Sequence, residues 1–349
     1  MAKPEVKLEP TPVGTPLSSA KTRGALSWAH LQRSRLPERL ALPAVWLLVI
    51  ILFGALRSDT FLTTANLSTM LSSQAGLLVL ALAIIVPLTA GDYDLSLAAT
   101  AELTAMVIAV LNVQHHWPIA AAVAFAVGIA VLVGFINGAV VILFRVESMI
   151  VTLGMATLLS GVVLWISGSA TIGGISEGLV NVVVGSQLLG VPINFYYGIV
   201  LCVLLWYVME YTPVGRRLLI VGRGRDVARL SGIRVSRIRW GALIVASAMA
   251  SLAGIMSAGT SGAADPSSVT TLLLPAFAAA FLGATTISPG RFTAWGCLVA
   301  VYFLVTGITG LQLLGAETYV QDLFYGAALI VAVALSQLSR RRTDSSATT

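Results

Sequence analysis

The chain has 349 residues, of which 57% are hydrophobic and only 10% are charged, and its net charge is +6. Soluble domains contain about a quarter charged residues, so this composition excludes a soluble globular protein and indicates a polytopic membrane protein. The positive charge does not predict nucleic-acid binding, because the basic residues lie in loops where membrane orientation explains them. We expect membrane lipid, and no nucleic acid, around the chain.

The N-terminal residues 1–39 are predicted to form a disordered basic tail, with prolines among Ser, Thr and charged residues. The first apolar run begins near Leu40, too late for the hydrophobic core of a signal peptide, and the arginines before it hold the N-terminus in the cytoplasm. Arg340-Arg341-Arg342 place the C-terminal tail, residues 339–349, in the cytoplasm as well. An even number of crossings follows.

Ten apolar runs approach the roughly 20 residues that span a bilayer. They lie at 40–57, 67–89, 97–111, 118–144, 148–168, 194–210, 239–260, 271–287, 293–310 and 318–336. We therefore predict an all-α transmembrane bundle of about ten helices over residues 40–338. The third, sixth and eighth runs are short, so we expect buried or broken core helices there. The outer loop 169–193 is either a short helix on the membrane surface or a plain connection.

A polar loop at 211–238 carries the strongest orientation signal. Eight arginines, one acid and no lysine lie between Thr212 and Trp240, with long apolar runs on both sides. Arginines near membrane helices stay on the side from which the helices insert, so this loop must face the cytoplasm.

The middle of this loop predicts a short helix with Asp226 as its N-cap and Gly232 as a left-handed stop. A helix of barely more than one turn is not stable alone. Val227 and Leu230 share a face, and Ala228 is small enough to let a partner approach closely. We expect another protein to dock on this face.

Acidic residues interrupt the apolar pattern after the second run. A carboxylate at mid-membrane costs about 2.5–3.5 kcal/mol on insertion scales, so such acids usually face the bundle interior or a water-filled path. Asp94 is expected to cap the following helix and shape a gate, Glu102 to face the pathway, and Asn137 to bond between helices. The candidate pathway or gate residues are Asp92, Asp94, Ser96, Glu102, Asn137 and Thr152.

The positions of the lysines and histidines argue against nucleotide and metal sites. Lys3, Lys7 and Lys21 are the only lysines and lie in the N-terminal tail, so the chain contains no Gly-x-x-x-x-Gly-Lys-Ser/Thr phosphate loop. The adjacent His115 and His116 precede Trp-Pro in an outer loop and indicate an interfacial turn rather than a metal site. We expect no metal, no cofactor and no catalytic residue in this chain.

Four sequence blocks carry a resemblance. Gly91–Ser96 is similar to Gly-Gly-Ile-Asp-Leu-Ser, and Asn137-Gly138 with Met149–Gly154 is similar to Asn-Gly and Phe-Ile-x-Thr-Leu-Gly. The third block, Thr212–Ile233, is similar to Thr-x-x-Gly-Arg, Gly-Gly-Asn and Ala-Ala-x-x-Ser-Gly-Ile. The fourth, Ala278–Thr285 with Gly290–Phe292, is similar to Ala-Ala-x-x-Leu-Gly-Gly-Thr and Gly-Gly-Arg-Gly. In these blocks the chain resembles the permease subunits of ribose-type ABC importers, which carry monosaccharides and an autoinducer sugar. Asp92 stands where that pattern has glycine, and Arg225 where it has asparagine.

The resemblance implies a multi-pass permease subunit in the plasma membrane, without ATP-binding motifs of its own. Two permease chains, either two copies of this one or this one with a relative, would form the pathway. Two cytoplasmic ATPase subunits would use the ATP, and an external binding protein would deliver a monosaccharide or similar solute. The residues expected to couple to the ATPase are Arg225, Asp226, Val227, Ala228, Arg229, Leu230, Ser231, Gly232 and Ile233.

Two other classes of membrane protein are alternatives to an ABC permease. Acids and a broken helix are also typical of proton-coupled secondary transporters, which remain the alternative. An intramembrane enzyme would need a nucleophile and a base close together, and no such pair can be identified.

Overall fold

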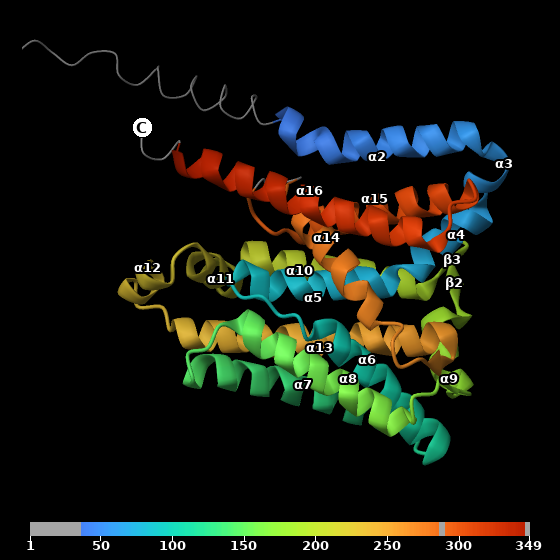
Figure 1. The fold of residues 1–349 in the computed structure, drawn as a ribbon, viewed down its shortest axis with the longest axis horizontal. Coiled ribbons are helices and arrows are strands. Elements are labelled where there is room, and N and C mark those ends of the chain that lie inside the picture. The colour runs from blue at the N-terminus through green and yellow to red at the C-terminus, as the bar shows by residue number, and fades with distance from the viewer. Residues whose placement is uncertain (1–35, 286–289, 346–349) are drawn as a thin grey trace, which may run out of the picture. The chain divides into compact units, whose positions relative to one another are not determined.

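The computed structural model describes residues 36–285 and 290–345, and this part of the chain is almost entirely helical (Figure 1). Residues from Arg39 onward form one unit. The α-helices are α2 (Leu36–Leu56), α3 (Ser58–Phe61), α4 (Thr64–Ser73), α5 (Ala75–Thr89), α6 (Leu97–Ala109), α7 (Ile119–Leu143), α8 (Ser148–Ser167), α9 (Glu177–Val180), α10 (Ile193–Tyr211), α11 (Pro213–Arg223), α12 (Arg225–Leu230), α13 (Val235–Ser261), α14 (Leu273–Gly283), α15 (Ala294–Leu313) and α16 (Thr318–Ser345).

Short elements complete the described chain. The π-helical turns η1 (Val110–Gln114) and η2 (Asn181–Gly185) extend α6 and α9, and the 3₁₀ turn η3 (Thr270–Leu272) precedes α14. Four two-residue strands form two antiparallel pairs, β1 (Ile172–Gly173) with β4 (Ala263–Ala264) and β2 (Gln187–Leu188) with β3 (Val191–Pro192).

Each of the ten predicted apolar runs overlaps a helix, and residues 286–287 of the eighth run lie outside the described part of the chain. Seven described helical stretches are long and apolar enough to cross a membrane, and shorter apolar helices lie at Leu42–Leu56, Thr270–Gly283 and Thr318–Ala334. The expectation of an all-α polytopic membrane protein is confirmed. Ten crossings, with both ends in the cytoplasm, stay a prediction.

The expectation of short core helices holds for the third and eighth runs and is wrong for the sixth. α6 has 13 residues and all are buried, and α14 has 11 with Pro275–Gly283 buried. α10, in contrast, runs for 19 residues without a break and leaves many of its side chains exposed. Its aromatic and aliphatic residues therefore suit a helix at the edge of the bundle.

Both terminal helices extend into the stretches predicted as tails. α2 begins at Leu36, inside the predicted tail 1–39, and its second residue is a proline, which the first turn of a helix tolerates. α16 continues to Ser345, inside the predicted tail 339–349, because no Gly or Pro follows Gly326 to end it. Residues 1–35 and 346–349 lie outside the described part of the chain.

The centre of the bundle is α5, which is apolar on every side. From Leu77 to Thr89 each of its residues is buried, and α10, α13, α14 and α15 pack around it. A helix that is hydrophobic all round belongs in such a position. On the other side of α13 lies α7, and a Cβ added to Gly134 would lie 2.8 Å from the Ile244 Cα, so these two helices touch through backbone.

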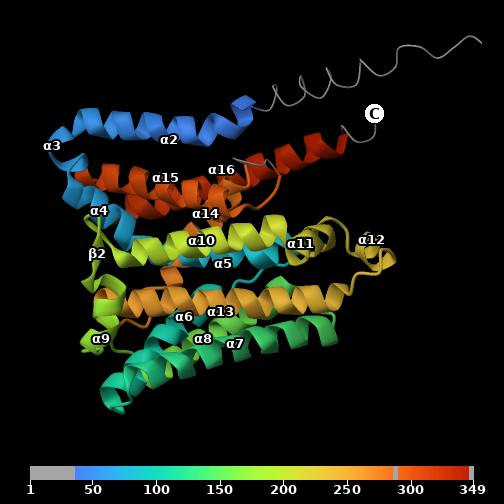
Figure 2. The ribbon, with the colours of Figure 1, turned by 180° about the vertical axis from the view of Figure 1, so that it is seen from behind.

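Two halves of the chain repeat one order of elements. In each, a long helix leads through a stretch without α-helix to a short buried helix and then to two long ones: α5, α6, α7, α8 and α13, α14, α15, α16. α5 runs from α4 towards α11, whereas α13 runs from α12 towards α9, so the repeated units point in opposite directions (Figures 1 and 2). Repeats of inverted orientation are frequent in transporters.

The helix formed by α4 and α5 is interrupted at Gln74. The interruption leaves two carbonyl groups without their helical partners, and other helices supply donors. Tyr302 Oη of α15 donates to the Leu71 carbonyl at 3.1 Å, and Asn194 Nδ2 of α10 donates to the Ser72 carbonyl at 3.0 Å. Breaks at membrane depth persist only where neighbouring groups satisfy the freed backbone in this way.

The two ends of the unit from Arg39 onward are formed by different elements. α11 and α12 project at one end, while α4, α9 and the β2–β3 hairpin lie at the opposite end in both views (Figures 1 and 2). The predicted loop 169–193 contains the short helix α9, one of the two interpretations left open. Its position on a membrane surface stays a prediction.

Candidate translocation and coupling sites

The segment between α5 and α6, residues 90–96, is not α-helical, and its buried polar side chains alternate with the exposed Gly91 and Tyr93. Gly91 has a φ of +78°, a left-handed conformation that glycine adopts without strain. Asp92, Asp94 and Ser96 are each at most 1% exposed. Buried polar groups of this kind need partners within the protein, and they obtain them from two directions.

On one side, the segment joins α7. Asp94 Oδ1 accepts hydrogen bonds from the Ser96 backbone N–H at 2.9 Å and from the Ser96 hydroxyl at 2.6 Å. The N-cap of α6 is Ser96, and no side chain of the described residues bonds to the N–H groups of the first helical turn, so the expectation that Asp94 caps this helix is wrong. Asn137 Nδ2 donates to Ser96 Oγ at 2.9 Å, which is an interhelical bond of the expected kind. Within the described residues, Asp94 Oδ2 and Asn137 Oδ1 have no partner, so this buried cluster retains two free acceptors.

On the other side, the segment joins α8. The Tyr93 backbone N–H donates to Ser148 Oγ at 3.1 Å, and the Leu95 N–H donates to Thr152 Oγ1 at 3.0 Å. Four of the sequence-predicted residues, Asp94, Ser96, Asn137 and Thr152, therefore meet around one segment. Ser148 was missed. Its spacing of four residues before Thr152 puts both hydroxyls on one helix face, and that spacing was the available signal.

Glu102 lies apart from this cluster. Its Oε2 accepts the backbone N–H groups of Val269 at 2.6 Å and Thr270 at 3.1 Å, at the start of η3 before α14. Glu102 is 1% exposed, and its Oε1 has no partner among the described residues. Its observed contacts are structural, since a carboxylate near orphan N–H groups at a helix start satisfies them.

Asp92 connects the segment 90–96 to the arginine-rich loop. Arg239, near the start of α13, binds it through two nitrogens, Nε to Oδ2 at 2.7 Å and Nη2 to Oδ1 at 2.6 Å. Arg225, the first residue of α12, places Nη2 3.0 Å from Oδ1 and 2.9 Å from the Gly91 carbonyl. We call these three side chains the Asp92 clamp. The sequence reading missed Arg239, although a buried aspartate requires a cation.

Close backbone contact reinforces the clamp. A Cβ on Gly222 of α11 would lie 2.0 Å from the Thr89 carbonyl oxygen, so α11 lies directly against the end of α5. Only glycine permits that approach. The arginine-rich loop is thus attached to the α5–α6 segment by backbone packing and by ion pairs.

The predicted short helix is present as α12, which has six residues, but two details of the prediction are wrong. Its N-cap is Gly224, and Asp226 lies within the first turn, where it pairs with Arg229 at 3.1 Å. Ala228 is completely buried and packs against Val221 of α11 and Val235 of α13. It therefore holds α12 to its own chain, and it does not lie on the open face.

The open face of α12 is apolar. Val227 is 65% exposed and Leu230 is 90% exposed, which agrees with the predicted shared face. Gly232 has a φ of +77° and ends the helix in the left-handed conformation, as predicted.

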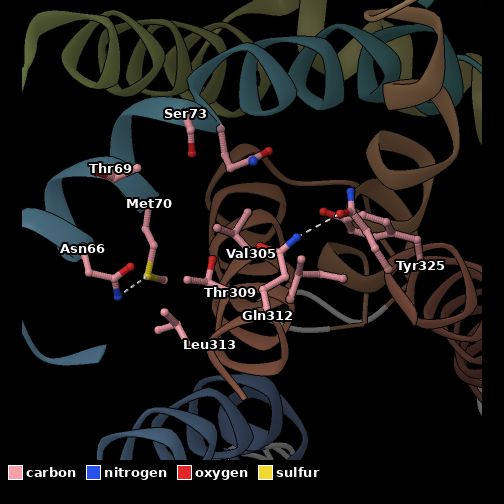
Figure 3. A pocket seen from close by; sticks show the side chains of 12 residues that line it. Asn66, Thr69, Met70, Ser73, Val305, Thr309, Gln312, Leu313 and Tyr325 are labelled. Carbon is pink, nitrogen blue, oxygen red and sulfur yellow. Dashed lines mark hydrogen bonds between the residues drawn. The ribbon is translucent and has the colours of Figure 1, made fainter. Parts of the chain in front are cut away.

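A cavity of about 310 Å³ lies between α4, α15 and α16 (Figure 3). α4 lies at the end of the unit opposite α12 (Figure 1). Its polar walls include Asn66, Thr69, Ser73, Gln74, Thr309 and Gln312. Nothing in the sequence reading pointed to it. The available signal was Ser-Ser-Gln at residues 72–74, a polar triplet inside an apolar run.

Comparison with known proteins completes the description. Residues 66–333 match the model of a family described as branched-chain amino acid transport system / permease component. The chain is 30% identical to the ribose import permease protein RbsC of Escherichia coli K12, over 82% of this chain and 90% of that protein. It is 28% identical to the D-allose transport system permease protein AlsC of the same organism, over 83% and 89%.

A third relative extends the match. The L-arabinose ABC transporter permease protein AraH of Azospirillum brasilense is 27% identical over 93% of each chain. No solved structure matches this chain.

Proposed function

Because the chain belongs to the family of branched-chain amino acid transport system permease components, and is a multi-pass protein of the plasma membrane, we propose that it forms the pathway of an ATP-driven importer for a monosaccharide. The observation that carries this proposal is the match along most of the chain to permeases named for allose, ribose and arabinose. The energy would come from a separate ATPase chain, and an external binding protein would deliver the solute.

We further propose ten crossings with both termini in the cytoplasm. The arginines between residues 216 and 239 lie in α11 and α12 and in the residues that follow them. Positive charge of this density favours the cytoplasmic side. The cavity between α4, α15 and α16 would then open to the outside. A second permease chain, a copy or a relative, would complete the pathway.

The proposed docking element for the ATPase is α12, with the segment Arg225–Ile233 around it. The exposed side chains of Val227 and Leu230 support this role, since two neighbouring exposed apolar side chains on a six-residue helix are available to pack against a partner. Motion of α12 would reach the pathway through the Asp92 clamp, because Arg225 belongs to α12 and the buried Asp92 to the segment 90–96. Rigid-body coupling of this kind requires direct contacts between the moving parts.

The segment 90–96, with its buried polar side chains, is the proposed gate. Asp94 Oδ2 and Asn137 Oδ1 are acceptors without a partner in the described residues, and a solute hydroxyl or a water can donate to them. Glu102 has a different proposed role. Its bonds to Val269 and Thr270 support a positioning function for η3, which disfavours proton coupling through this acid.

The deciding experiment is uptake into proteoliposomes that contain the full complex of permease, ATPase and binding protein. We expect uptake of the solute held by the binding protein to require ATP inside and to be unaffected by a protonophore. A complex whose ATPase lacks its catalytic glutamate is the control and should show no uptake. Uptake that proceeds without ATP and collapses with the proton gradient would establish the secondary transporter instead.

A further inference from the structure

The cavity between α4, α15 and α16 has no role in the gate or in the docking element described above. One of its walls is α4, which lies at the end of the unit opposite α12 (Figures 1 and 3). Its volume of about 310 Å³ falls at the lower end of the range of small-molecule sites, roughly 300–1,000 Å³. The space therefore suits one small solute.

The walls of the cavity carry hydrogen-bonding groups without charge. Eight of its twelve lining residues bear a hydroxyl or a side-chain amide, and none of the twelve is Asp, Glu, Lys or Arg. Hydroxyl and amide groups donate and accept, as sugar hydroxyls do. A charged solute would find no opposite charge here.

Several of these groups are free to bind a ligand. Among the described residues, Ser73 Oγ and Thr309 Oγ1 make no hydrogen bond within the chain, in contrast to Thr69, whose hydroxyl donates to the Ala65 carbonyl at 2.9 Å. Figure 3 shows Ser73 on α4 and Thr309 on α15, on different walls of the cavity. Gln312 Nε2 and Gln321 Oε1 lie 3.2 Å apart and join α15 to α16.

Apolar groups complete the lining. Met70 of α4 and Ile308 and Leu313 of α15 contribute to the walls, and such side chains can pack on the C–H face of a sugar ring. The cavity borders the interruption of the α4–α5 helix at Gln74, and interrupted helices form the solute sites of many transporters.

We propose that this cavity is the site where the permease receives its solute from the outer side, and that it accepts an uncharged polyhydroxylated molecule through Ser73, Thr309 and Gln312. This inference rests on the proposed import function. It adds to that function a location and a chemical class of ligand, set by hydroxyl and amide groups.

The test compares the variant Ser73→Ala/Thr309→Val with Thr157→Val in the reconstituted complex of permease, ATPase and binding protein. Thr157 lies on α8, and its hydroxyl donates to the Leu153 carbonyl at 3.1 Å, so this control loses a hydroxyl elsewhere. D-ribose, D-allose and L-arabinose are the probes. We expect the cavity variant to transport sugar roughly 10–100-fold more slowly than the unaltered complex, which corresponds to about 3–10-fold for each lost hydrogen bond. Its association with the ATPase should be unchanged. The Thr157→Val control should transport at the rate of the unaltered complex.

A second measurement covers the case in which the cavity variant fails to assemble. Thr309→Cys is labelled with a hydrophilic maleimide while the complex holds either loaded or empty binding protein, and Thr60→Cys, exposed at the same end, is the control. The native Cys202 and Cys297 are buried. Slower labelling at Thr309→Cys alone with loaded binding protein would support the site.

The possible failures are distinguishable. If the unaltered complex takes up neither these three sugars nor the solute held by its binding protein with ATP, the proposed function fails and this site with it. If the unaltered complex transports, but the cavity variant transports equally well and the labelling rates are the same with loaded and empty binding protein, the site is wrong and the function stands.

Discussion

Arg239 holds Asp92 in a two-point ion pair, although 147 positions separate the two residues along the chain. Asp92 is 1% exposed and the Arg239 side chain 12% exposed, so both charges are removed from water. Pairs of this kind contribute little net stability compared with apolar residues, yet loss of one partner is costly. The pair therefore fixes the position of α13 relative to the 90–96 segment.

The first prediction concerns this pair. Arg239→Gln should lower the free energy of unfolding by about 3–5 kcal/mol, because it leaves most of the Asp92 charge buried without its main partner. Thermal unfolding of the purified permease measures the effect. Arg229→Gln is the control, since Arg229 and Asp226 are exposed and such surface pairs contribute at most about 1 kcal/mol. Equal, small effects in both variants would show that the clamp does not bear on stability.

The second prediction concerns docking of the ATPase. Leu230→Asp should leave insertion and stability unchanged and abolish co-purification with the ATPase, because the leucine side chain is 90% exposed. Leu189→Asp is a matched control: Leu189 is 92% exposed in the β2–β3 turn, at the opposite end. Ala228→Glu is unsuitable, since it would bury a carboxylate among Val221 and Val235. Normal association of Leu230→Asp with the ATPase would place the docking surface elsewhere.

The third prediction concerns orientation. Cysteines at Arg223 or Arg341 should react with a membrane-impermeant thiol reagent only after the membrane is opened, whereas a cysteine at Glu177 should react in intact cells. The distribution of arginines is the reason. The buried Cys202 and Cys297 provide a low background. Labelling of Arg223→Cys in intact cells would reverse the whole arrangement.

The fourth prediction uses two glycines of α13. A Cβ on Gly254 would lie 2.2 Å from the Ala101 carbonyl oxygen, whereas nothing lies within 4 Å of a Cβ on Gly241. Gly254→Ala should therefore destabilise the protein by about 1–3 kcal/mol through overpacking. Gly241→Ala should be neutral or stabilising by up to about 1 kcal/mol, the usual gain inside a helix. Thermal unfolding in detergent compares the two, and equal midpoints would contradict the packing of α6 on α13.

The fifth prediction concerns Glu102. Glu102→Gln retains an acceptor oxygen for the N–H groups of Val269 and Thr270, so uptake should remain largely intact. Glu102→Ala leaves both N–H groups without a partner and should lower stability by about 1–3 kcal/mol for each buried group. Uptake and thermal unfolding are measured on both variants. Loss of uptake in Glu102→Gln at normal stability would favour a proton-carrying role.

Local sequence patterns were sufficient to predict much of this fold. Runs of apolar residues located the helices, and the 227/230 spacing located the open face of α12, because both depend only on near neighbours in sequence. Ala228 could not be oriented in this way. Its side chain turns towards Val235, which lies on another helix, so small size alone did not distinguish an inward from an outward position.

The parts that escaped prediction depend on distant contacts. The polar triplet before Ala75 interrupts a helix only because Asn194 and Tyr302 meet the freed carbonyls, and neither donor lies within 100 residues of the break. Arg239 likewise lies more than 100 residues from its partner Asp92. Hydropathy identifies a buried acid that needs a partner, and it does not indicate which of eight arginines provides it.

The central position of α5 has a consequence for biogenesis. α5 emerges from the ribosome long before α13, α14 and α15, which surround it in the finished protein. Meanwhile lipid can solvate its apolar surface, but the partners of Asp92 are made 133 and 147 residues later, and the first partner of Glu102 is made 167 residues later. The first half therefore cannot complete its own core during synthesis. Final assembly of this permease has to follow insertion of the second half, and a nascent chain that stops before α13 should be a substrate for membrane quality control.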